Sequence, residues 1–420
     1  MRTLADWLAH SLSSHARSVD LGLDRVRTVA ARLALLESRR PVIIVGGTNG
    51  KGSTASTIAA LLGACGRCPG LFTSPHLLRY NERIQIAGQA VDDAELVRAF
   101  VRIEQMRGEV TLTFFEYNAL VALEVFRAAA VDAVVLEVGL GGRLDATNII
   151  DADVAVLCSV DIDHREWLGA TREQIGREKA GIFRRHQQVV LGTPDMPASV
   201  WQAASALECT LTTAERDFHW EVAAGGRWCY RSARLTLPDL PAPALAGTIQ
   251  YRNAATAIAA LQLLDLDAGR EPERIGAGLA AVRLPGRFQL VAGPVQWLLD
   301  VAHNAAAAAV LAAELRSRPV PGRTLAVAGM LADKDAAAVA MALDPLVDAW
   351  ILCGIEDEPR GLRAVELRDR IGTLRGTIAL ADSVREALER ARAMAHSGDR
   401  VLVFGSFHVV GPALVWLGYT

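Results

Sequence analysis

The feature that most limits the fold of this chain is the alternation of short apolar runs with longer amphipathic segments. The apolar runs are rich in β-branched residues, which is typical of buried strands, and the amphipathic segments have helical spacing. This alternation indicates a mainly parallel sheet with helices on both faces, so the predicted fold class is α/β. The strands expected in the N-terminal part are 41–47, 131–139, 152–160 and 187–192.

A second α/β series begins near residue 295 and contains five further strand-like runs. It has the size of a separate domain, smaller than the first and Rossmann-like. We therefore expect a domain of the nucleotide-loop ATPase type at 1–287, a linker at 288–294 rich in Gly and Pro, and a C-terminal domain at 295–420. Residues 209–237 are more polar and predict a small antiparallel region.

Charge and composition point to small-molecule substrates. A formal net charge of -3, with 22% charged residues, gives no electrostatic reason to expect a nucleic acid or a membrane as partner. The sequence shows no secretory leader and no long apolar span, so a cytoplasmic monomer is expected. Six cysteines are scattered along the chain, and Cys65 and Cys68 are interpreted as a helix end rather than a redox pair.

The stretch "VGGTNGKGST" at 45–54 lies between an apolar strand and a helical segment. Glycines at such a turn expose backbone N–H groups at a helix N-terminus, where phosphate binds, although the spacing differs from the common loop. A turn that needs glycine only for its geometry is the less favoured alternative. Ser53 or Thr54 offers a hydroxyl. The residues expected to bind nucleotide here are Thr48, Asn49, Gly50, Lys51, Gly52 and Ser53.

The string "GTNGKGST" resembles the ATP loop of the Mur ligase superfamily, and the whole chain resembles its folylpolyglutamate synthase family, particularly the bifunctional members. The resemblance extends over nearly the whole chain. The other strings that carry it, in the family's order, are "DLGLDRV", "SPHLLRYNERIQIAG", "TFFEYNALVALE", "LEVGLGGRLDATNI", "DHREWLG", "IGREKAGIF", "LPGRFQ", "DVAHN", "GMLADKD" and "VFGSFH".

The resemblance implies an ATP-dependent ligase. A substrate carboxylate attacks the γ-phosphate of ATP, and the amine of L-glutamate displaces phosphate from the acyl phosphate to form an amide. The implied acceptors are dihydropteroate and reduced folates, and the alternative is a monofunctional folylpolyglutamate synthase. Because a carboxylate and a triphosphate repel each other, the site needs cations, and the resemblance implies two Mg²⁺ ions.

Metal ligands are expected where strands end. Glu137 ends the run "DAVVLEVG" and His164 follows the next strand, and ligands bind at this edge of open α/β sheets. Alone, His164 is more typical of a surface or capping residue, but the resemblance implies that it is a ligand. The resemblance adds the hydroxyl of Ser74. It also implies that Lys179, by itself typical of a solvated helix residue, is carbamylated by CO₂ and binds the second ion, which requires a lowered pKa.

The remaining assignments follow from the resemblance. It places Asn253, Arg287 and Asp300 at the nucleotide and His303 at the transferred phosphate, although Arg287 alone is typical of an exposed arginine. The residues implied in catalysis are Lys51, His164, Lys179 and His303. The pterin ring needs apolar faces with a few polar groups. The residues implied to bind it are Leu21, Gly22, Phe115, Glu116, Leu144, Asp145 and Ala146.

The sequence is also compatible with three other interpretations. Phe114 and Phe115 are also compatible with core packing at the start of a helix. A cell-wall Mur ligase is disfavoured because the nucleotide loop begins by residue 46, which leaves no room for its additional N-terminal domain. A non-catalytic nucleotide switch is disfavoured because it explains neither the second α/β series nor the pterin-like segments.

Overall fold

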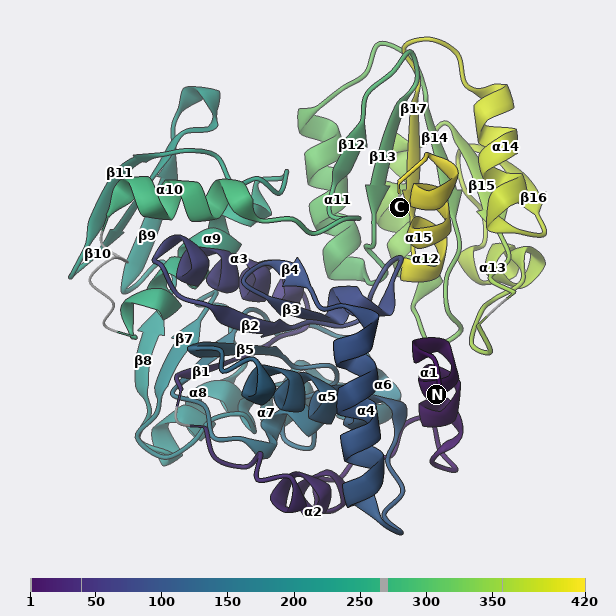
Figure 1. Ribbon diagram of the computed structural model, residues 1–420. Coiled ribbons are helices and arrows are strands. Elements are labelled where there is room, and N and C mark those ends of the chain that lie inside the picture. Colours follow the sequence, from purple (N-terminus) through teal and green to yellow (C-terminus); the bar gives the residue numbers. More distant parts are fainter. Residues whose placement is uncertain (1, 39, 265–270, 357, 420) are drawn as a thin grey trace. The chain divides into compact units, whose positions relative to one another are not determined.

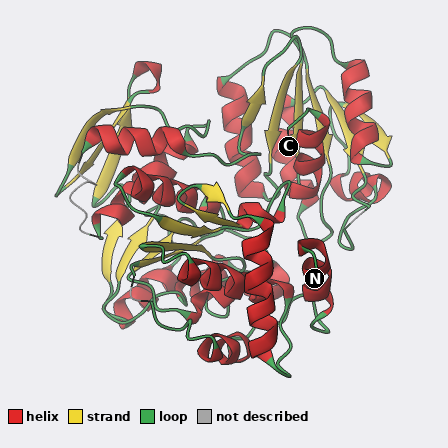
Figure 2. Ribbon diagram, in the orientation of Figure 1, coloured by secondary structure: helices red, strands yellow, loops and turns green. Residues whose placement is uncertain are grey.

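The computed structural model describes residues 2–38, 40–264, 271–356 and 358–419. The chain forms two compact units, shown in Figure 1. Both are α/β, which confirms the predicted fold class, and Figure 2 shows strands and helices alternating in each. The first unit contains residues 1–76, 80–244 and 250–283, and the second contains residues 77–79, 245–249 and 284–420.

The first unit is built on an eight-stranded sheet with the order β4-β3-β2-β5-β1-β6-β7-β8. The strands from β2 to β8 in this order are parallel, and β3 and β4 extend the sheet antiparallel at one edge. The strands are β1 (Val42–Gly46), β2 (Pro69–Phe72), β3 (Ile84–Ile86), β4 (Gln89–Ala90), β5 (Ala133–Glu137), β6 (Val154–Leu157), β7 (Gln188–Leu191) and β8 (Thr210–Thr213).

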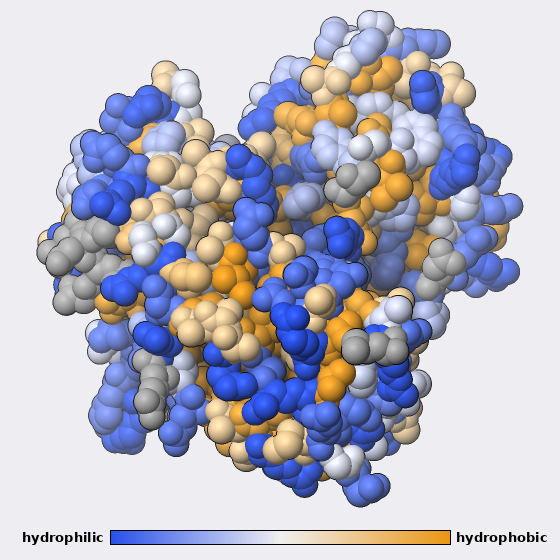
Figure 3. Space-filling view, viewed as in Figure 1, coloured by the Kyte–Doolittle hydropathy of each residue, from blue (hydrophilic) through white to orange (hydrophobic). Residues whose placement is uncertain are grey.

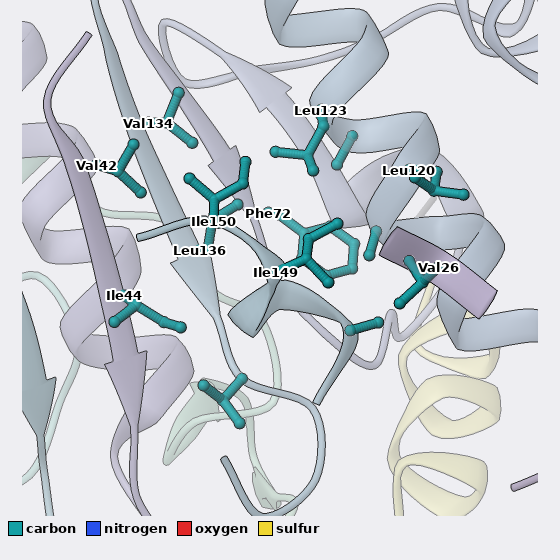
Figure 4. Close-up of a cluster of buried hydrophobic side chains, with 14 of the residues drawn as sticks. Val26, Val42, Ile44, Phe72, Leu120, Leu123, Val134, Leu136, Ile149 and Ile150 are labelled. Atoms are coloured by element: carbon teal, nitrogen blue, oxygen red, sulfur yellow. The ribbon is translucent and has the colours of Figure 1, made fainter. Parts of the chain in front are cut away.

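The sheet is buried on both faces, which explains why its strands are continuously apolar. In β1, Val42 and Ile44 belong to one core cluster, whereas Ile43 and Val45 belong to the other, as the twofold alternation of a strand requires. Figure 4 shows part of the first cluster, where side chains of β1 and β5 meet those of the helix that begins at Phe114.

Helices cover each face of this sheet. The cluster that contains Val42 includes residues of α1, α2, α4, α5, α7 and α8, and the cluster that contains Ile43 includes residues of α3, α9 and α10. The helices are α1 (Leu4–Ser13), α2 (Asp24–Arg32), α3 (Lys51–Ala64), α4 (Asp93–Arg107), α5 (Phe114–Ala128), α6 (Arg165–Leu168), α7 (Arg172–Ala180), α8 (Ala198–Ala206), α9 (Ile249–Gln262) and α10 (Pro272–Ala281), with 3-10 turns η1 (Tyr80–Arg83), η2 (Ala146–Ile149) and η3 (Ala224–Gly226).

The expected antiparallel region is present but begins later than 209. Strands β9 (Phe218–Val222), β10 (Trp228–Ser232) and β11 (Thr236–Leu240) form a three-stranded antiparallel sheet. In contrast, β8 pairs parallel with β7 and completes the main sheet. The polar composition of β8 reflects its position at the sheet edge, where fewer side chains are buried.

The second unit contains a six-stranded sheet with the order β12-β13-β17-β14-β15-β16, in which only the pairing of β12 is antiparallel. Core residues of α11, α12 and α13 form one cluster and those of α14 and α15 another. The elements are β12 (Gln289–Val291), β13 (Gln296–Asp300), α11 (Ala305–Ser317), β14 (Thr324–Ala328), α12 (Ala336–Leu343), η5 (Asp344–Leu346), β15 (Ala349–Cys353), α13 (Ala364–Ile371), β16 (Thr377–Ala381), α14 (Val384–Met394), β17 (Arg400–Phe404) and α15 (Phe407–Trp416).

The expected linker differs from the structure in two respects. Residues 289–291 form β12, which pairs with β13 and adds a sixth strand to the five that were expected. The expected linker also belongs to the second compact unit, because the long segment of that unit begins at Leu284. The domain boundaries 1–287 and 295–420 stay a prediction, and the compact units of the structure are divided at residues 283 and 284 in this region.

Across the described ranges, no helix is long and apolar enough to cross a membrane. On the face shown in Figure 3, hydrophobic residues are interspersed with hydrophilic ones. The most exposed large hydrophobic residues come from different elements, namely Leu12, Val415 and Met341.

Candidate active site

The glycine-rich loop connects β1 to α3, as expected. Gly50 adopts φ +86° at the N-cap of α3, a left-handed conformation that favours glycine. Gly47, at φ +146°, lies so close to the next strand segment that an added Cβ would stand 3.0 Å from Cβ of Cys158. Both glycines are therefore required by backbone geometry, and α3 starts with its unpaired N–H groups at the loop.

The loop is held from the segment that follows β6. The N–H of Thr48 donates to the carbonyl of Ser159 (2.8 Å), and the Ser159 hydroxyl accepts from the N–H of Asn49 (3.1 Å). The Thr48 hydroxyl donates to the carbonyl of Asp161 (3.1 Å) and accepts from its N–H (3.0 Å). Sequence reasoning missed Ser159, although the strand-end argument used for Glu137 applies to it equally.

The two hydroxyls after Lys51 have different environments. Thr54 is fully buried, and its Oγ1 accepts from Sγ of Cys158 at 3.4 Å. Ser53 is 3% exposed and lies one position nearer the loop, and its backbone carbonyl accepts the Thr57 hydroxyl at 2.7 Å. The Lys51 ammonium donates to the carbonyl of Thr48 at 3.2 Å and so folds back over the loop.

Lys179, on α7, is buried and its Nζ donates to the carbonyl of Gly47 at 2.9 Å. Burial, together with the nearby Lys51 ammonium, lowers its pKa from 10.5 to about 7. The interpretation of Lys179 as a solvated helix residue is therefore wrong. The structure instead holds a buried amine with a lowered pKa against the glycine-rich loop.

Glu137 ends β5, and its carboxylate lies against the first turn of α3. An added Cβ at Gly52 would stand 3.4 Å from both carboxylate oxygens, and Oε2 accepts the N–H of Ser74 at 3.0 Å. Only 4% of Glu137 is exposed. A buried carboxylate beside a helix N-terminus is favoured electrostatically, and it is the type of ligand that Mg²⁺ prefers.

His164 caps the short helix α6 with a left-handed backbone at φ +50°. Its backbone N–H donates to Oδ1 of Asp163 at 2.8 Å. The negative charge of Asp163 raises the pKa of Lys179, but less than burial and Lys51 lower it. Within the described parts of the chain, no group of three or more His, Cys, Asp or Glu side chains forms a metal site. Two of the four predicted metal ligands are Ser74 and Lys179, which are outside those residue types. Lys179 can provide an oxygen ligand only if it is carbamylated.

Asn253, on α9, contacts the loop at Gly50. Its Oδ1 is 3.0 Å from where a Cβ of Gly50 would stand, and its Nδ2 donates to Oε1 of Gln250 at 3.0 Å. The structure thus brings Asn253, Lys179 and Glu137 to three different glycines of the segment 45–54.

Two of the three segments predicted to bind the pterin are linked through Gly139. The ring of Phe115 lies so close to Gly139 that an added Cβ would stand 2.4 Å from Cζ. Glu116 accepts the N–H of Thr113 (2.7 Å) in the capping box of α5. Leu21 and Leu144 are half-buried, and Ala146 is buried.

The Asp145 carboxylate is hydrogen-bonded mainly to backbone N–H groups. It accepts hydrogen bonds from the N–H groups of Gly139 (3.0 Å), Leu140 (2.8 Å) and Thr147 (3.0 Å) and from the Thr147 hydroxyl (2.6 Å). Burial raises its pKa. These hydrogen bonds hold the glycine-rich turn at 139–142 in place. The Asp145 carboxylate therefore stabilises the shape of this segment.

The predicted residues of the second unit also lie together. The carboxylate of Asp300 accepts the N–H groups of Phe288 and Ala302, both at 2.8 Å, and burial raises its pKa. The guanidinium of Arg287 lies 5.2 Å above the ring of Phe407, and the His303 ring centroid is 6.4 Å from that ring. Phe407, the first residue of α15, was not predicted individually.

A glycine-rich loop at the carboxyl end of a central parallel strand, with a buried carboxylate and a buried amine against it, is typical of enzymes that transfer phosphate with the help of metal ions. Family models agree and specify the chemistry. Residues 45–261 match the Mur ligase middle domain, and residues 286–407 match the Mur ligase glutamate ligase domain.

Among known proteins, the chain is 44% identical over 407 residues to the dihydrofolate synthase/folylpolyglutamate synthase of Escherichia coli, covering 97% of this chain and 94% of that protein. Its fold matches E. coli FolC in complex with DHPP and ADP with a TM-score of 0.93 and 43% identity, over 99% and 98% of the two chains. It also matches a bifunctional folylpolyglutamate synthase/dihydrofolate synthase with Mn, AMPPNP and L-glutamate bound, with a TM-score of 0.91 and 41% identity over 99% and 98%.

The chain belongs to the Mur ligase family, in its dihydrofolate synthase/folylpolyglutamate synthase branch. The predicted resemblance is confirmed, and so is the predicted class of activity, an ATP-dependent, amide-forming glutamate ligase of folate metabolism. The monofunctional alternative is not favoured, because these relatives combine both activities in one chain.

Proposed function

We propose that this chain uses ATP and Mg²⁺ to join L-glutamate to dihydropteroate, forming dihydrofolate, and to reduced folates, forming folylpolyglutamates. Both reactions proceed through an acyl phosphate. The ligands in the relatives' structures support the assignment, since they include ADP, AMPPNP, Mn, DHPP and L-glutamate. The acceptors share one requirement, a carboxylate that can be brought to the γ-phosphate.

The observation that carries the proposal is the convergence of Lys179 and Glu137 on the glycine-rich loop. Lys179 donates to the carbonyl of Gly47, and Glu137 lies against Gly52. An amine with a pKa of about 7 is available to react with CO₂ at neutral pH, which converts Lys179 into a carboxylate-like ligand. The two side chains then supply hard oxygen donors at the site where triphosphate binds.

The residues divide the reaction between them. Thr48 and Asn49 keep the loop in shape through their hydrogen bonds to Ser159 and Asp161, and the N-terminus of α3 with the Ser53 hydroxyl binds the phosphates. Lys51 neutralises charge at the γ-phosphate. Ser74, Glu137, His164 and carbamylated Lys179 would hold two Mg²⁺ ions, which lower the repulsion between the attacking carboxylate and the triphosphate. Asn253, Arg287 and Asp300 bind the nucleotide, and His303 assists at the transferred phosphate.

The pterin-bearing substrate lies against the segments that contain Leu21, Gly22, Phe115 and Glu116. Phe115 offers a half-buried aromatic face, and the capped first turn of α5 fixes that face in place. The turn from Leu144 to Ala146 completes this set of contacts. A cytoplasmic, monomeric state stays a prediction.

Trapping the intermediate tests the proposal. The protein is incubated with Mg-ATP, dihydropteroate and hydroxylamine, without glutamate. The acyl phosphate should react with hydroxylamine and give the hydroxamate of dihydropteroate together with ADP. A matched reaction with EDTA should give neither. ADP release that never yields hydroxamate would refute the acyl phosphate route.

A further inference from the structure

The segment before α2 is closed by an arginine. Arg25, in the first turn of α2, donates from NH2 to the carbonyl of Asp20 at 2.6 Å, and its NH1 pairs with Oδ2 of Asp20 at 2.9 Å. The guanidinium thus binds both the main chain and the side chain of the residue five positions earlier. Leu21 and Gly22 lie inside the loop that this contact closes.

The same guanidinium reaches a second element. NH2 of Arg25 pairs with Oε1 of Glu116 at 3.2 Å. Glu116 is buried and its other oxygen accepts the N–H of Thr113 in the capping box of α5. The partner of Arg25 is therefore fixed by helix capping, and it is adjacent to Phe115.

A histidine makes a parallel connection. Nε2 of His15 lies 3.1 Å from Oδ2 of Asp20, and its Nδ1 lies 2.8 Å from Oγ1 of Thr111. Thr111 precedes the N-cap of α5 by two residues. Two connections therefore link the segment from His15 to Asp20 with the start of α5. His15 makes one directly to Thr111, and Arg25 makes the other by pairing with both Asp20 and Glu116 through its planar guanidinium.

The closed segment leaves one face open. A Cβ added at Gly22 would meet no atom within 4 Å, and Leu21 is only half-buried. These contacts hold the backbone at Gly22 relative to Phe115 without covering it. This is the arrangement needed to present main-chain groups to a flat ligand.

We propose that Arg25 is a positioning residue for the pterin end of the acyl substrate, because it fixes the segment with Leu21 and Gly22 against the first turn of α5. The inference rests on the proposed function. Arg25 touches Asp20 and Glu116 and acts on the substrate through them. Its loss leaves Glu116 without its charged partner and leaves Asp20 held by His15 alone, so the substrate must then order the segment when it binds.

Kinetics of three variants test the proposal. Arg25→Ala should raise KM for dihydropteroate about tenfold or more, as expected when charge-assisted hydrogen bonds are lost, and leave KM for ATP within about twofold. Arg25→Lys, which keeps the charge but not the fork, should give an intermediate KM. Arg27→Ala is the matched control, since Arg27 is an exposed residue of the same helix.

Hydrogen exchange provides a readout that does not depend on turnover. Arg25→Ala should accelerate exchange of amides in residues 14–23 and leave residues 45–54 unchanged. A wild-type protein that forms no dihydrofolate would overturn the proposed function and this inference together. Wild-type activity with an unchanged KM for dihydropteroate in Arg25→Ala, or an equal rise in both KM values, would overturn the positioning role alone.

Discussion

Replacing Lys179 with methionine should abolish ligation and change how stability depends on pH. The folded-state pKa of Lys179 is about 7 and its unperturbed value is 10.5, so the folded state binds fewer protons than the unfolded state between these two values. The buried Lys179 lowers the free energy of unfolding most below pH 7, where it must be protonated in both states. This loss is recovered as the pH rises from about 7 toward 10.5, because only the unfolded state then binds the proton. Methionine fills similar space without carrying the charge.

The size of the effect follows from the shift. Between pH 6 and pH 9, the free energy of unfolding of the wild type should rise relative to Lys179→Met by roughly 2 to 3 kcal/mol. The same shift controls carbamate formation. At pH 7.5 about three quarters of such an amine is neutral, compared with about one in a thousand for an ordinary lysine.

Two assays measure these effects. Urea unfolding of both proteins in CO₂-free buffer gives the pH dependence of stability. NMR with ¹³C-bicarbonate should show one carbamate signal, absent in Lys179→Met and retained in Lys334→Arg; the chain contains only three lysines, so assignment is direct. Full ligase activity in Lys179→Met, or no relative change in stability from pH 6 to pH 9, would refute the reasoning.

Three further substitutions test the site. Lys51→Ala should lower glutamate-dependent ATP hydrolysis by about 100-fold or more with an unchanged thermal midpoint, because the loop glycines remain; undiminished hydrolysis would contradict the assigned charge. Glu137→Gln should weaken Mn²⁺ binding measured by EPR, and unaltered affinity would remove it from the ligand set. Gly139→Ala should cost about 1 to 3 kcal/mol and raise KM for dihydropteroate, since its Cβ would stand 2.4 Å from Phe115; a variant with wild-type stability would argue against that packing.

Much of the fold could be predicted from hydrophobic pattern alone. Central strands such as β1 and β5 are buried on both faces and are therefore continuously apolar, which makes them easy to recognise. Edge strands gave weaker signals. Strand β12 has only half-buried and exposed residues, and β4 has two exposed residues, so neither has an apolar run to detect.

The site could be predicted only in part, because sequence identifies residue types but not where their polar atoms are used. Glu137 could be predicted because it ends an apolar strand, at the carboxyl end of the sheet where ligands bind in open α/β folds. The local pattern around Lys179 indicated a solvated residue, and its burial depends on contact with Gly47, which is distant in sequence. Likewise, Arg25 was not predicted, since its partner Glu116 lies 91 residues away.

The central claim is that one active site serves two acceptors. The direct measurement is to incubate purified protein with Mg-ATP and labelled glutamate, with dihydropteroate in one reaction and a reduced folate monoglutamate in the other, and to resolve the products by mass. The account predicts dihydrofolate in the first and folate diglutamate in the second, with both products lost in Lys179→Met. Product from the folate alone would contradict the bifunctional assignment, and product from neither would contradict the proposed ligase activity.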